Sequence, residues 1–391
     1  MRRIGMLTSG GDCQALNATM RGVAKSLYNM FDDVEIIGFE DGYKGLMYAD
    51  YQIMKSSDFS GILTQGGTIL GTSRQPFKLM RTPDENGLDK VEAMKHTYKK
   101  LKLSCLVVLG GNGSQKTANM LSEEGLNVVS LPKTIDNDLW GTDMTFGFQS
   151  AVDVATNAID CIHTTAASHG RVFIVEVMGH KVGWLTLYAG LAGGADIILL
   201  PEIPYDINIV CDALTKRSKA GKRFSILAVA EGAISREDAK MSKKELKEKK
   251  KSGVVYPSVA YEIGAKIQEV IGSEVRVTVP GHMQRGGEPC AYDRVLADVP
   301  CSGLGLLRKK PDIRLKKDGS EIDALVGIQR QILEQAAKYV KDGGVLVYST
   351  CTLSRKENEK NVEWFLQNHE SYRLEDLGQY LPESLAAEGE K

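Results

Sequence analysis

The chain has 391 residues, of which 42% are hydrophobic and 25% charged, and its formal net charge is −1 at pH 7. This length suits two or three domains, and the balanced charge argues against an overall electrostatic grip on nucleic acid or a membrane. The seven cysteines form no C-x-x-C pair and no signal peptide or long apolar span is visible, so we expect a reduced, cytoplasmic protein that does not cross a membrane.

The first part of the chain alternates short apolar runs with glycine-rich turns. Arg3–Thr8 is predicted as a strand that leads into Ser9-Gly10-Gly11-Asp12 and then into an amphipathic helix, Ala15–Tyr28. This layout points backbone N–H groups at an anion, although a plain strand-to-helix turn has the same appearance. Val34–Phe39 is predicted as a second strand, followed by Asp41-Gly42-Tyr43-Lys44-Gly45.

Two further glycine-rich loops follow. Gly66-Gly67-Thr68 precedes Gly71-Thr72-Ser73-Arg74, where the arginine is suited to clamping phosphate, or is an ordinary surface residue. Cys105–Leu109 is predicted as a buried strand that ends in Gly110-Gly111-Asn112-Gly113-Ser114, with a helix to about Glu124. Alternating strands and helices predict a parallel, doubly wound sheet, so we expect all these loops to face one crevice.

The stretch Pro132-Lys133-Thr134-Ile135-Asp136-Asn137-Asp138 follows an apolar run, Asn127–Leu131, that is predicted as a buried strand. Two carboxylates two residues apart at a strand end suit phosphoryl transfer. One can take a proton from the attacking hydroxyl and the other can position metal-bound phosphates. The alternative is a turn that is rich in Asp and Asn for local reasons.

The second half repeats the alternation of helix and strand. A helix is predicted over Gln149–Ser168, and the predicted strands are Arg171–Val177, Asp196–Leu200, Arg223–Ala230 and Val275–Val279. Three of these strands end in loops suited to ligand contact: Met178-Gly179-His180, Glu231-Gly232 and Gly281–Gly287. A lysine-rich stretch, Lys240–Lys251, is interpreted as a solvated helix or loop rather than a nucleic-acid patch.

These loops, in this order, resemble the 6-phosphofructokinase family over about residues 1–297. The resemblance implies an α/β protein with doubly wound, mostly parallel sheets in two lobes. Residues 1–140 would form the donor-binding lobe and residues 141–297 the sugar-phosphate lobe, without the tail that the family usually carries. The implied activity is phosphoryl transfer from ATP or pyrophosphate to the C1 hydroxyl of fructose 6-phosphate in glycolysis.

The resemblance also implies roles for single residues. Asp136 would be the general base, with Thr134 and Asp138 next to the transferring group. The phosphoryl donor and Mg²⁺ would be held by Gly11, Arg74, Gly111, Asn112, Gly113, Ser114 and Lys133, with Asn112 as the metal ligand. The sugar phosphate would be held by Arg171, Met178, Gly179, Glu231, Arg276, His282 and Arg285. Arginines matching Arg171 and Arg276 reach across from a neighbouring subunit in the family, so a homo-oligomer, a dimer or tetramer, is implied.

The sequence departs from the family pattern at several positions. Cys13-Gln14-Ala15 replaces the usual small residue, Pro and Gly, so the first phosphate turn is expected to differ. Asn112 stands where the family usually has Asp, and His180 where Arg is common. Gly113 is typical of ATP users and Lys133 of pyrophosphate users, and this combination leaves the donor open, with ATP favoured.

After Leu296 the resemblance changes. Asp298-Val299-Pro300-Cys301-Ser302-Gly303, the predicted helix Leu325–Tyr339, the predicted strand Val345–Ser349 and the segment Ser349–Glu359 resemble RNA cytosine-C5 methyltransferases of the RsmB/NOP/Sun type, over about residues 292–371. Residues 298–391 would then be a partial Rossmann-like methyltransferase domain.

In that family a thiolate adds to C6 of cytosine so that C5 can attack the methyl donor. By resemblance Cys351 is the nucleophile, Cys301 releases the product, and Asp298 contacts cytosine or S-adenosylmethionine, with RNA as the partner. The alternative is that both cysteines are small buried hydrophobic residues. The family's glycine-rich loop for S-adenosylmethionine should precede Asp298, where phosphofructokinase-like sequence stands instead, so we expect no binding of the methyl donor.

Both families carry a stretch like Asp293–Asp298, and the two parts are interpreted as joined there, through recombination or faulty assembly of sequence reads. Three functions therefore remain: a phosphofructokinase, a methyltransferase fragment, and an inactive hybrid. Since the second part lacks most of its sheet partners, we expect marginal stability or aggregation.

Overall fold

The computed structural model describes residues 1–242, 244–246, 248, 255–295, 326–327, 329–331, 333–334, 337, 355–356 and 358–373. The chain divides into two compact units, Met1–Leu296 and Ala297–Lys391. No helix within these described stretches is long and apolar enough to cross a membrane.

The first part of unit 1 is a five-stranded sheet in the order β3-β2-β1-β4-β5. Its strands are β1 (Arg2–Ser9), β2 (Val34–Phe39), β3 (Tyr51–Met54), β4 (Cys105–Gly110) and β5 (Val128–Pro132). All neighbouring pairs are parallel except β2 with β3. The helices are α1 (Leu16–Met30), α2 (Tyr43–Tyr48), α3 (Lys90–Lys100) and α4 (Asn112–Glu123), with short 3-10 turns at Ser56–Phe59, Ile62–Thr64 and Phe77–Leu79.

The second part of unit 1 is a four-stranded parallel sheet in the order β7-β8-β6-β9. Its strands are β6 (Val172–Val177), β7 (Ile197–Leu199), β8 (Ser225–Ala230) and β9 (Val275–Thr278). The helices are α5 (Phe148–His169), α6 (Trp184–Ala192), α7 (Ile207–Lys219), α9 (Val259–Ile271) and α10 (Ala291–Val295), with 3-10 turns η4 (Asp238–Lys240) and η5 (Gly281–Arg285). The lobe boundary expected at residue 140 falls between the two sheets.

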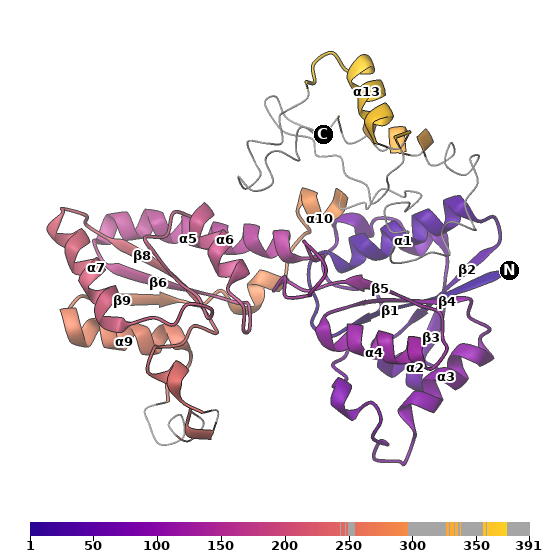
Figure 1. Ribbon diagram of the computed structural model, residues 1–391, viewed down its shortest axis with the longest axis horizontal. Coiled ribbons are helices and arrows are strands. Elements are labelled where there is room, and N and C mark those ends of the chain that lie inside the picture. The colour runs from indigo at the N-terminus through magenta and orange to yellow at the C-terminus, as the bar shows by residue number, and fades with distance from the viewer. Residues whose placement is uncertain are drawn as a thin grey trace. The chain divides into compact units, whose positions relative to one another are not determined.

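Side chains alternate between the two faces of each sheet and thereby divide the core. In the first sheet, Ile4 and Met6 of β1 pack towards α1, whereas Leu7 packs towards α2, α3 and α4. Figure 1 shows α1 on one face of this sheet and α2, α3 and α4 on the other. The cluster that contains α1 continues through α5 and α6 to the second sheet, so the two sheets share one hydrophobic core.

A buried carboxylate near the end of unit 1 caps the N-terminus of α5. Asp293 of α10 is 3% exposed and accepts hydrogen bonds from the backbone N–H groups of Gly147 (2.9 Å) and Ser150 (3.0 Å) at the start of α5. The Ser150 hydroxyl also bonds to Asp293 and accepts from the Cys290 N–H at 2.9 Å. Because α5 has no side-chain cap of its own, Asp293 supplies the missing acceptors from far along the chain.

Two expectations about unit 1 are wrong. The strand at Asn127–Leu131 is β5, an edge strand that is only partly buried, and Val129 is 49% exposed. The glycine-rich loops do not all meet in one crevice, because Asp41–Gly45 and Gly66–Thr68 do not line the pocket at the strand ends. Gly42 packs against the end of β1, where a Cβ would lie 2.5 Å from the Thr8 carbonyl oxygen.

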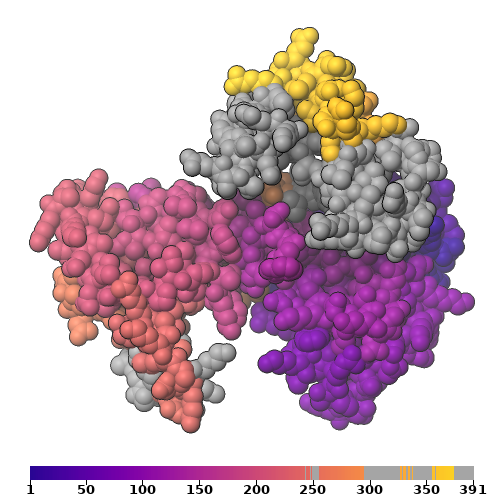
Figure 2. Space-filling view, in the orientation of Figure 1, coloured from indigo at the N-terminus to yellow at the C-terminus, as the bar shows by residue number. Residues whose placement is uncertain are grey.

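Unit 2 is described around α13 (Glu359–Asn368), and the described positions between 326 and 337 are helical. Phe365 and His369 stack with ring centroids 4.2 Å apart, and Arg330 lies over Trp364 at 4.8 Å. Figure 2 shows the described residues of α13, in yellow, gathered in one cluster. Asp298, Cys301, Cys351, the predicted strand Val345–Ser349 and most of the lysine-rich stretch lie outside the described residues.

Candidate active site

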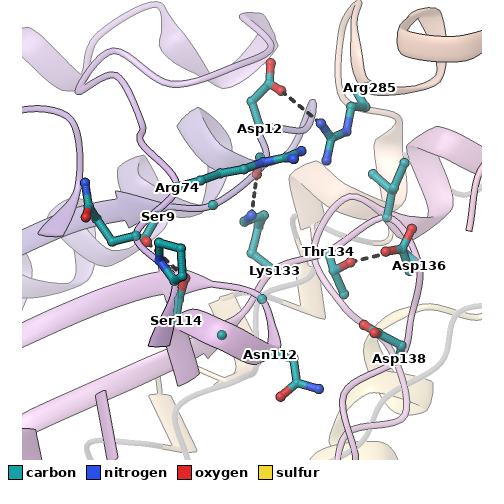
Figure 3. A pocket seen from close by; sticks show the side chains of 17 residues that line it. Ser9, Asp12, Arg74, Asn112, Ser114, Lys133, Thr134, Asp136, Asp138 and Arg285 are labelled. Carbon is teal, nitrogen blue, oxygen red and sulfur yellow. Dashed lines mark hydrogen bonds and ion pairs between the residues drawn. The ribbon is translucent and has the colours of Figure 1, made fainter. Parts of the chain in front are cut away.

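A pocket of about 370 Å³ lies at the carboxyl ends of β1, β4 and β5. Parallel strands present their carboxyl ends at the same edge of a sheet, so loops distant in sequence meet there. The pocket is lined by Ser9, Gly10, Gly11, Asp12, Arg74, Gln75, Pro76, Gly111, Asn112, Gly113, Ser114, Lys133, Thr134, Ile135, Asp136, Asp138 and Arg285. Figure 3 shows the side chains of Lys133, Thr134 and Asp136, from the loop that follows β5, in one pocket with Arg285 of η5.

The first glycine turn lies directly against Arg285. A Cβ on Gly11 would stand 2.0 Å from Nη2 of Arg285, so only glycine allows this approach. Nη1 of Arg285 is 3.9 Å from the Asp12 carboxylate. This long ion pair leaves the guanidinium with hydrogen-bond donors for an anionic ligand.

Lys133 is 4% exposed and donates to the carbonyl oxygen of Gly11. Burial lowers its pKa, and the nearby Arg285 charge acts in the same direction. The adjacent thiol of Cys13 is buried and its pKa is raised to about 11, so it is neutral at pH 7, and the negative charges that favour the protonated lysine are those of Asp12 and Asp136. The pocket therefore holds a poorly solvated cation beside the first turn, an arrangement that favours an anion.

The second glycine turn begins α4. The buried Ser114 hydroxyl donates to Ser9 Oγ at 3.0 Å, and the Tyr43 hydroxyl donates to the Ser114 carbonyl oxygen at 2.8 Å. These contacts fix the helix start against β1. Asn112 is exposed at the pocket wall. A Cβ on Gly113 would meet no atom of the described residues within 4 Å, so space remains beside it.

Asp136 stands in surroundings that oppose its charge. Burial raises its pKa, the carboxylates of Asp138 and Glu231 raise it further, and the positive charges of Arg285 and His180 act in the opposite direction. A carboxylate with a raised pKa is a better proton acceptor than an ordinary one. The group is therefore suited to deprotonating a hydroxyl in the pocket.

The loop that carries Asp136 is fixed by neighbours that the sequence did not single out. Asn137 adopts a left-handed backbone conformation with φ 52°, and its side chain accepts from the Thr145 N–H at 2.9 Å and donates to the Asp143 carbonyl oxygen at 3.1 Å. The Thr145 hydroxyl donates to the Thr134 carbonyl oxygen at 2.7 Å, and Thr134 Oγ accepts from the Asp136 N–H at 3.1 Å. The tolerance of Asn for this conformation is a signal that the sequence does carry.

Of the residues expected on the sugar side, only Arg285 lines this pocket. Glu231 accepts from the backbone N–H groups of Gly179 (3.3 Å) and His180 (2.5 Å) through one carboxylate oxygen. The Met178 N–H donates to Gln284 at 3.2 Å. Met178, Gly179 and Glu231 therefore form one hydrogen-bonded group near Asp136, and His282 is exposed.

Arg171 and Arg276 lie elsewhere. Both are paired with Glu274, Arg171 at 2.6 Å. Arg171 directly precedes β6, at the opposite end of the strand from Met178. These two arginines therefore do not reach the pocket of their own chain.

The oxygen atoms of the pocket suit a Mg²⁺ ion whose remaining ligands would be the phosphates of a bound substrate. No group of three or more His, Cys, Asp or Glu able to hold a metal occurs in the part of the chain that the structure describes. Mg²⁺ is usually bound through one or two protein oxygens together with substrate phosphates. Asn112 and Asp138, both exposed in the pocket, offer such oxygens.

Comparison with known families gives two matches. The family model "Phosphofructokinase" matches residues 3–300, and "16S rRNA methyltransferase RsmB/F" matches residues 264–390. The two matches overlap over residues 264–300. This overlap contains the Asp293–Asp298 stretch that both families were expected to share.

Curated relatives resemble the first part of the chain. The ATP-dependent 6-phosphofructokinase of Spirochaeta thermophila is 57% identical over 303 residues, which cover 76% of this chain and 81% of that protein. ATP-dependent 6-phosphofructokinase 3 of Bacteroides thetaiotaomicron is 46% identical, covering 75% of this chain and 82% of that protein.

Solved structures share the fold. Phosphofructokinase from Saccharomyces cerevisiae aligns with a TM-score of 0.64 and 31% identity, over 76% of this chain but only 40% of that chain. A pyrophosphate-dependent phosphofructokinase from Nitrosospira multiformis aligns with a TM-score of 0.63 and 20% identity, over 75% of this chain and 73% of that chain.

Proposed function

Because this chain belongs to the phosphofructokinase family, we propose that unit 1 transfers the terminal phosphoryl group of ATP to the C1 hydroxyl of fructose 6-phosphate. The observation that carries this proposal is the pocket that joins two glycine turns, a buried lysine and Asp136, whose pKa is raised by burial. The relatives named ATP-dependent 6-phosphofructokinase support ATP as the phosphoryl donor and fructose 6-phosphate as the acceptor. We propose that the reaction takes place in the cytoplasm.

Asp136 is proposed to accept the proton of the C1 hydroxyl as that oxygen attacks the terminal phosphorus in line. The bond from phosphorus to the donor's bridging oxygen breaks, and the leaving group keeps the electron pair. Thr134 holds the Asp136 backbone in place. Most of the rate acceleration would come from positioning and charge neutralisation, since the phosphoryl group needs little covalent chemistry from the protein.

The donor is proposed to lie along the two glycine turns. Gly11, Gly111, Gly113 and Ser114 would offer close backbone approach, and Lys133 and Arg74 positive charge. Asn112 and Asp138 would hold Mg²⁺ with the donor's phosphates, and the ion would neutralise charge that develops on the phosphoryl oxygens. ATP is favoured over pyrophosphate by the space beside Gly113.

The sugar phosphate is proposed to contact Met178, Gly179, Glu231, His282 and Arg285. Arg171 and Arg276 would serve a neighbouring subunit, since they lie away from the pocket of their own chain. A homo-oligomer is therefore part of the proposal.

The test is a coupled assay with fructose 6-phosphate and either ATP or pyrophosphate, on the purified full chain and on Asp136→Asn. Phosphoryl transfer by the wild type from at least one donor, lost in the variant, is expected. Sedimentation of the same samples reports the oligomeric state, and a monomer with full activity would refute the proposed role of Arg171 and Arg276.

A methyltransferase function for unit 2 is a second candidate, favoured by the family match over residues 264–390. In it Cys351 would be the nucleophile, Cys301 would release the product, and Asp298 would contact the cytosine or the donor. Equilibrium dialysis with S-adenosylmethionine tests this candidate, and no binding is expected because the donor-binding loop is missing.

A further inference from the structure

Gln14 follows the first glycine turn and is completely buried. Its amide Nε2 donates to the carbonyl oxygens of Gln284 at 3.2 Å and Gly286 at 3.0 Å. These two residues stand directly before and after Arg285. One amide group therefore holds the backbone on both sides of that arginine.

Arg285 occupies a central place in the pocket. Its guanidinium lies over Gly11, and its charge acts on both Lys133 and Asp136. Its Nε is buried and has no hydrogen-bond partner among the described residues. The side chain is therefore held in place by its own backbone and by packing, more than by polar contacts of the guanidinium.

The loop 281–287 is fixed from the second lobe as well. Gln284 accepts from the Met178 N–H at 3.2 Å, and its amide donates to the Gly281 carbonyl oxygen at 3.2 Å. On the other side, a Cβ on Gly66 would stand 1.9 Å from the Gly287 carbonyl oxygen. The loop thus bridges the glycine turns of the first lobe and the group that contains Met178 and Glu231.

We propose that Gln14 is a positioning residue for phosphoryl transfer, which fixes the loop 281–287 so that the Arg285 guanidinium stands between the donor turn and Asp136. The proposal rests on the proposed function and deepens it. A guanidinium fixed there would stabilise the charge of the transferring group without reorganisation during the reaction.

A double-mutant cycle tests this role. Gln14→Met keeps the length of the side chain but removes the donor. We expect kcat to fall at least tenfold, with the KM values for both substrates changed less than threefold. Because Gln14 acts through Arg285, Gln14→Met should cost little further activity in an Arg285→Ala background. Asp89→Ala, which removes the cap of α3 and does not line the pocket, serves as a control that lowers stability and leaves kcat unchanged.

Hydrogen exchange of peptides covering residues 281–287 gives a readout without catalysis. Faster exchange there in Gln14→Met, but not in Asp89→Ala, is expected. Unchanged exchange, or fully additive losses in the cycle, would overturn the proposal. If wild type transfers no phosphoryl group, the proposed function fails, whereas the exchange comparison still decides whether Gln14 fixes the loop. Should Gln14→Met not fold, Gln14→Asn, which shortens the amide by one methylene, gives the same comparison.

Discussion

The negative charge of ionised Asp136 lowers the free energy of unfolding, because the folded state disfavours that charge. Its pKa is raised by burial and by Asp138 and Glu231. A carboxyl with a raised folded-state pKa contributes stability that is fully present below its unfolded pKa and is lost as pH rises through the folded value. Above its folded-state pKa the ionised Asp136 is therefore unfavourable for stability, although the proposed function requires it.

The first prediction follows from that sign. Asp136→Asn should raise the thermal midpoint of unit 1 at pH 7 while slowing phosphoryl transfer by about 10²- to 10⁴-fold. The gain in the midpoint should shrink as the pH falls below the folded pKa of Asp136. Scanning calorimetry from pH 4 to 8 measures this. A midpoint below that of wild type at pH 7 would contradict the account.

The second prediction concerns the pH profile. The acid limb of kcat/KM should lie above the usual carboxyl range of about 4. Arg285→Ala should move it to higher pH because a positive charge is lost, and Glu231→Gln should move it lower because a negative charge is lost. Steady-state rates at saturating donor provide the profile, and shifts of the opposite sign would refute the assignment of Asp136.

The third prediction concerns the donor. Gly113→Asp places a carboxylate in the open space at the start of α4, where it would repel and crowd a nucleotide. We expect kcat/KM for ATP to fall roughly tenfold, equivalent to about 1.4 kcal/mol, and the value for pyrophosphate to fall less. Gly113→Ala, which fits the same space without charge, is the matched control and should retain the use of ATP.

At the scale of elements, sequence periodicity predicted the strands of unit 1 other than β3, and the helices α1, α4 and α5, but not α2, α3, α6, α7 or α9. The strand Val34–Phe39 matches β2 residue for residue, and β1, β4, β6 and β8 differ from prediction only at their ends. The pattern missed β3, because Tyr51–Met54 is a short strand with three exposed residues out of four. The prediction that β5 is buried was also wrong, because the local sequence does not show which strands are neighbours in the sheet.

The candidate site likewise combines features that the sequence predicted with features that it did not. The glycine turns at Gly10–Asp12 and Gly110–Ser114 and the Thr134–Asp138 loop were predicted from local signals, and the structure brings these three segments into one pocket. The contacts of Gln14 and Asp293 were not predicted, because the partners of Gln14 are 270 and 272 residues away and those of Asp293 are 146 and 143 residues away. The hydrogen-bond partners of these buried polar side chains are brought close only by the tertiary structure, so the sequence alone does not identify them.

The fourth prediction belongs to α5. Asp293→Ala would leave two buried backbone N–H groups unpaired, each costing about 1–3 kcal/mol. We expect a loss of about 2–6 kcal/mol in urea unfolding. Asp206→Ala, which removes a single capping bond at α7, is the matched control and should lose about 1 kcal/mol. Equal losses would show that Asp293 is no more than an ordinary cap.

At the scale of the whole molecule, two families meet in one chain. The family matches overlap over residues 264–300, and the first compact unit ends at Leu296. Asp293, inside the overlap, is also the residue that caps α5. The sequence therefore changes from one family resemblance to the other in the same segment that caps α5 and ends unit 1.

The fifth prediction concerns stability and origin. We expect the full chain to unfold in separate steps or to aggregate, because the methyltransferase-like sequence after Leu296 is expected to be only part of that domain. Scanning calorimetry of the full chain measures this. A single cooperative transition at high temperature in soluble protein would contradict it. Independent long sequencing reads spanning residues 290–300 intact would exclude faulty assembly as the origin of the junction.

The most direct test of the central claim is the initial rate at which the full chain converts fructose 6-phosphate to its 1,6-bisphosphate with ATP and Mg²⁺. Wild type should turn over, and Asp136→Asn should be slower by about 10²- to 10⁴-fold, the usual contribution of a general base. A wild type that transfers nothing from ATP or from pyrophosphate, or a variant as fast as wild type, would contradict the account.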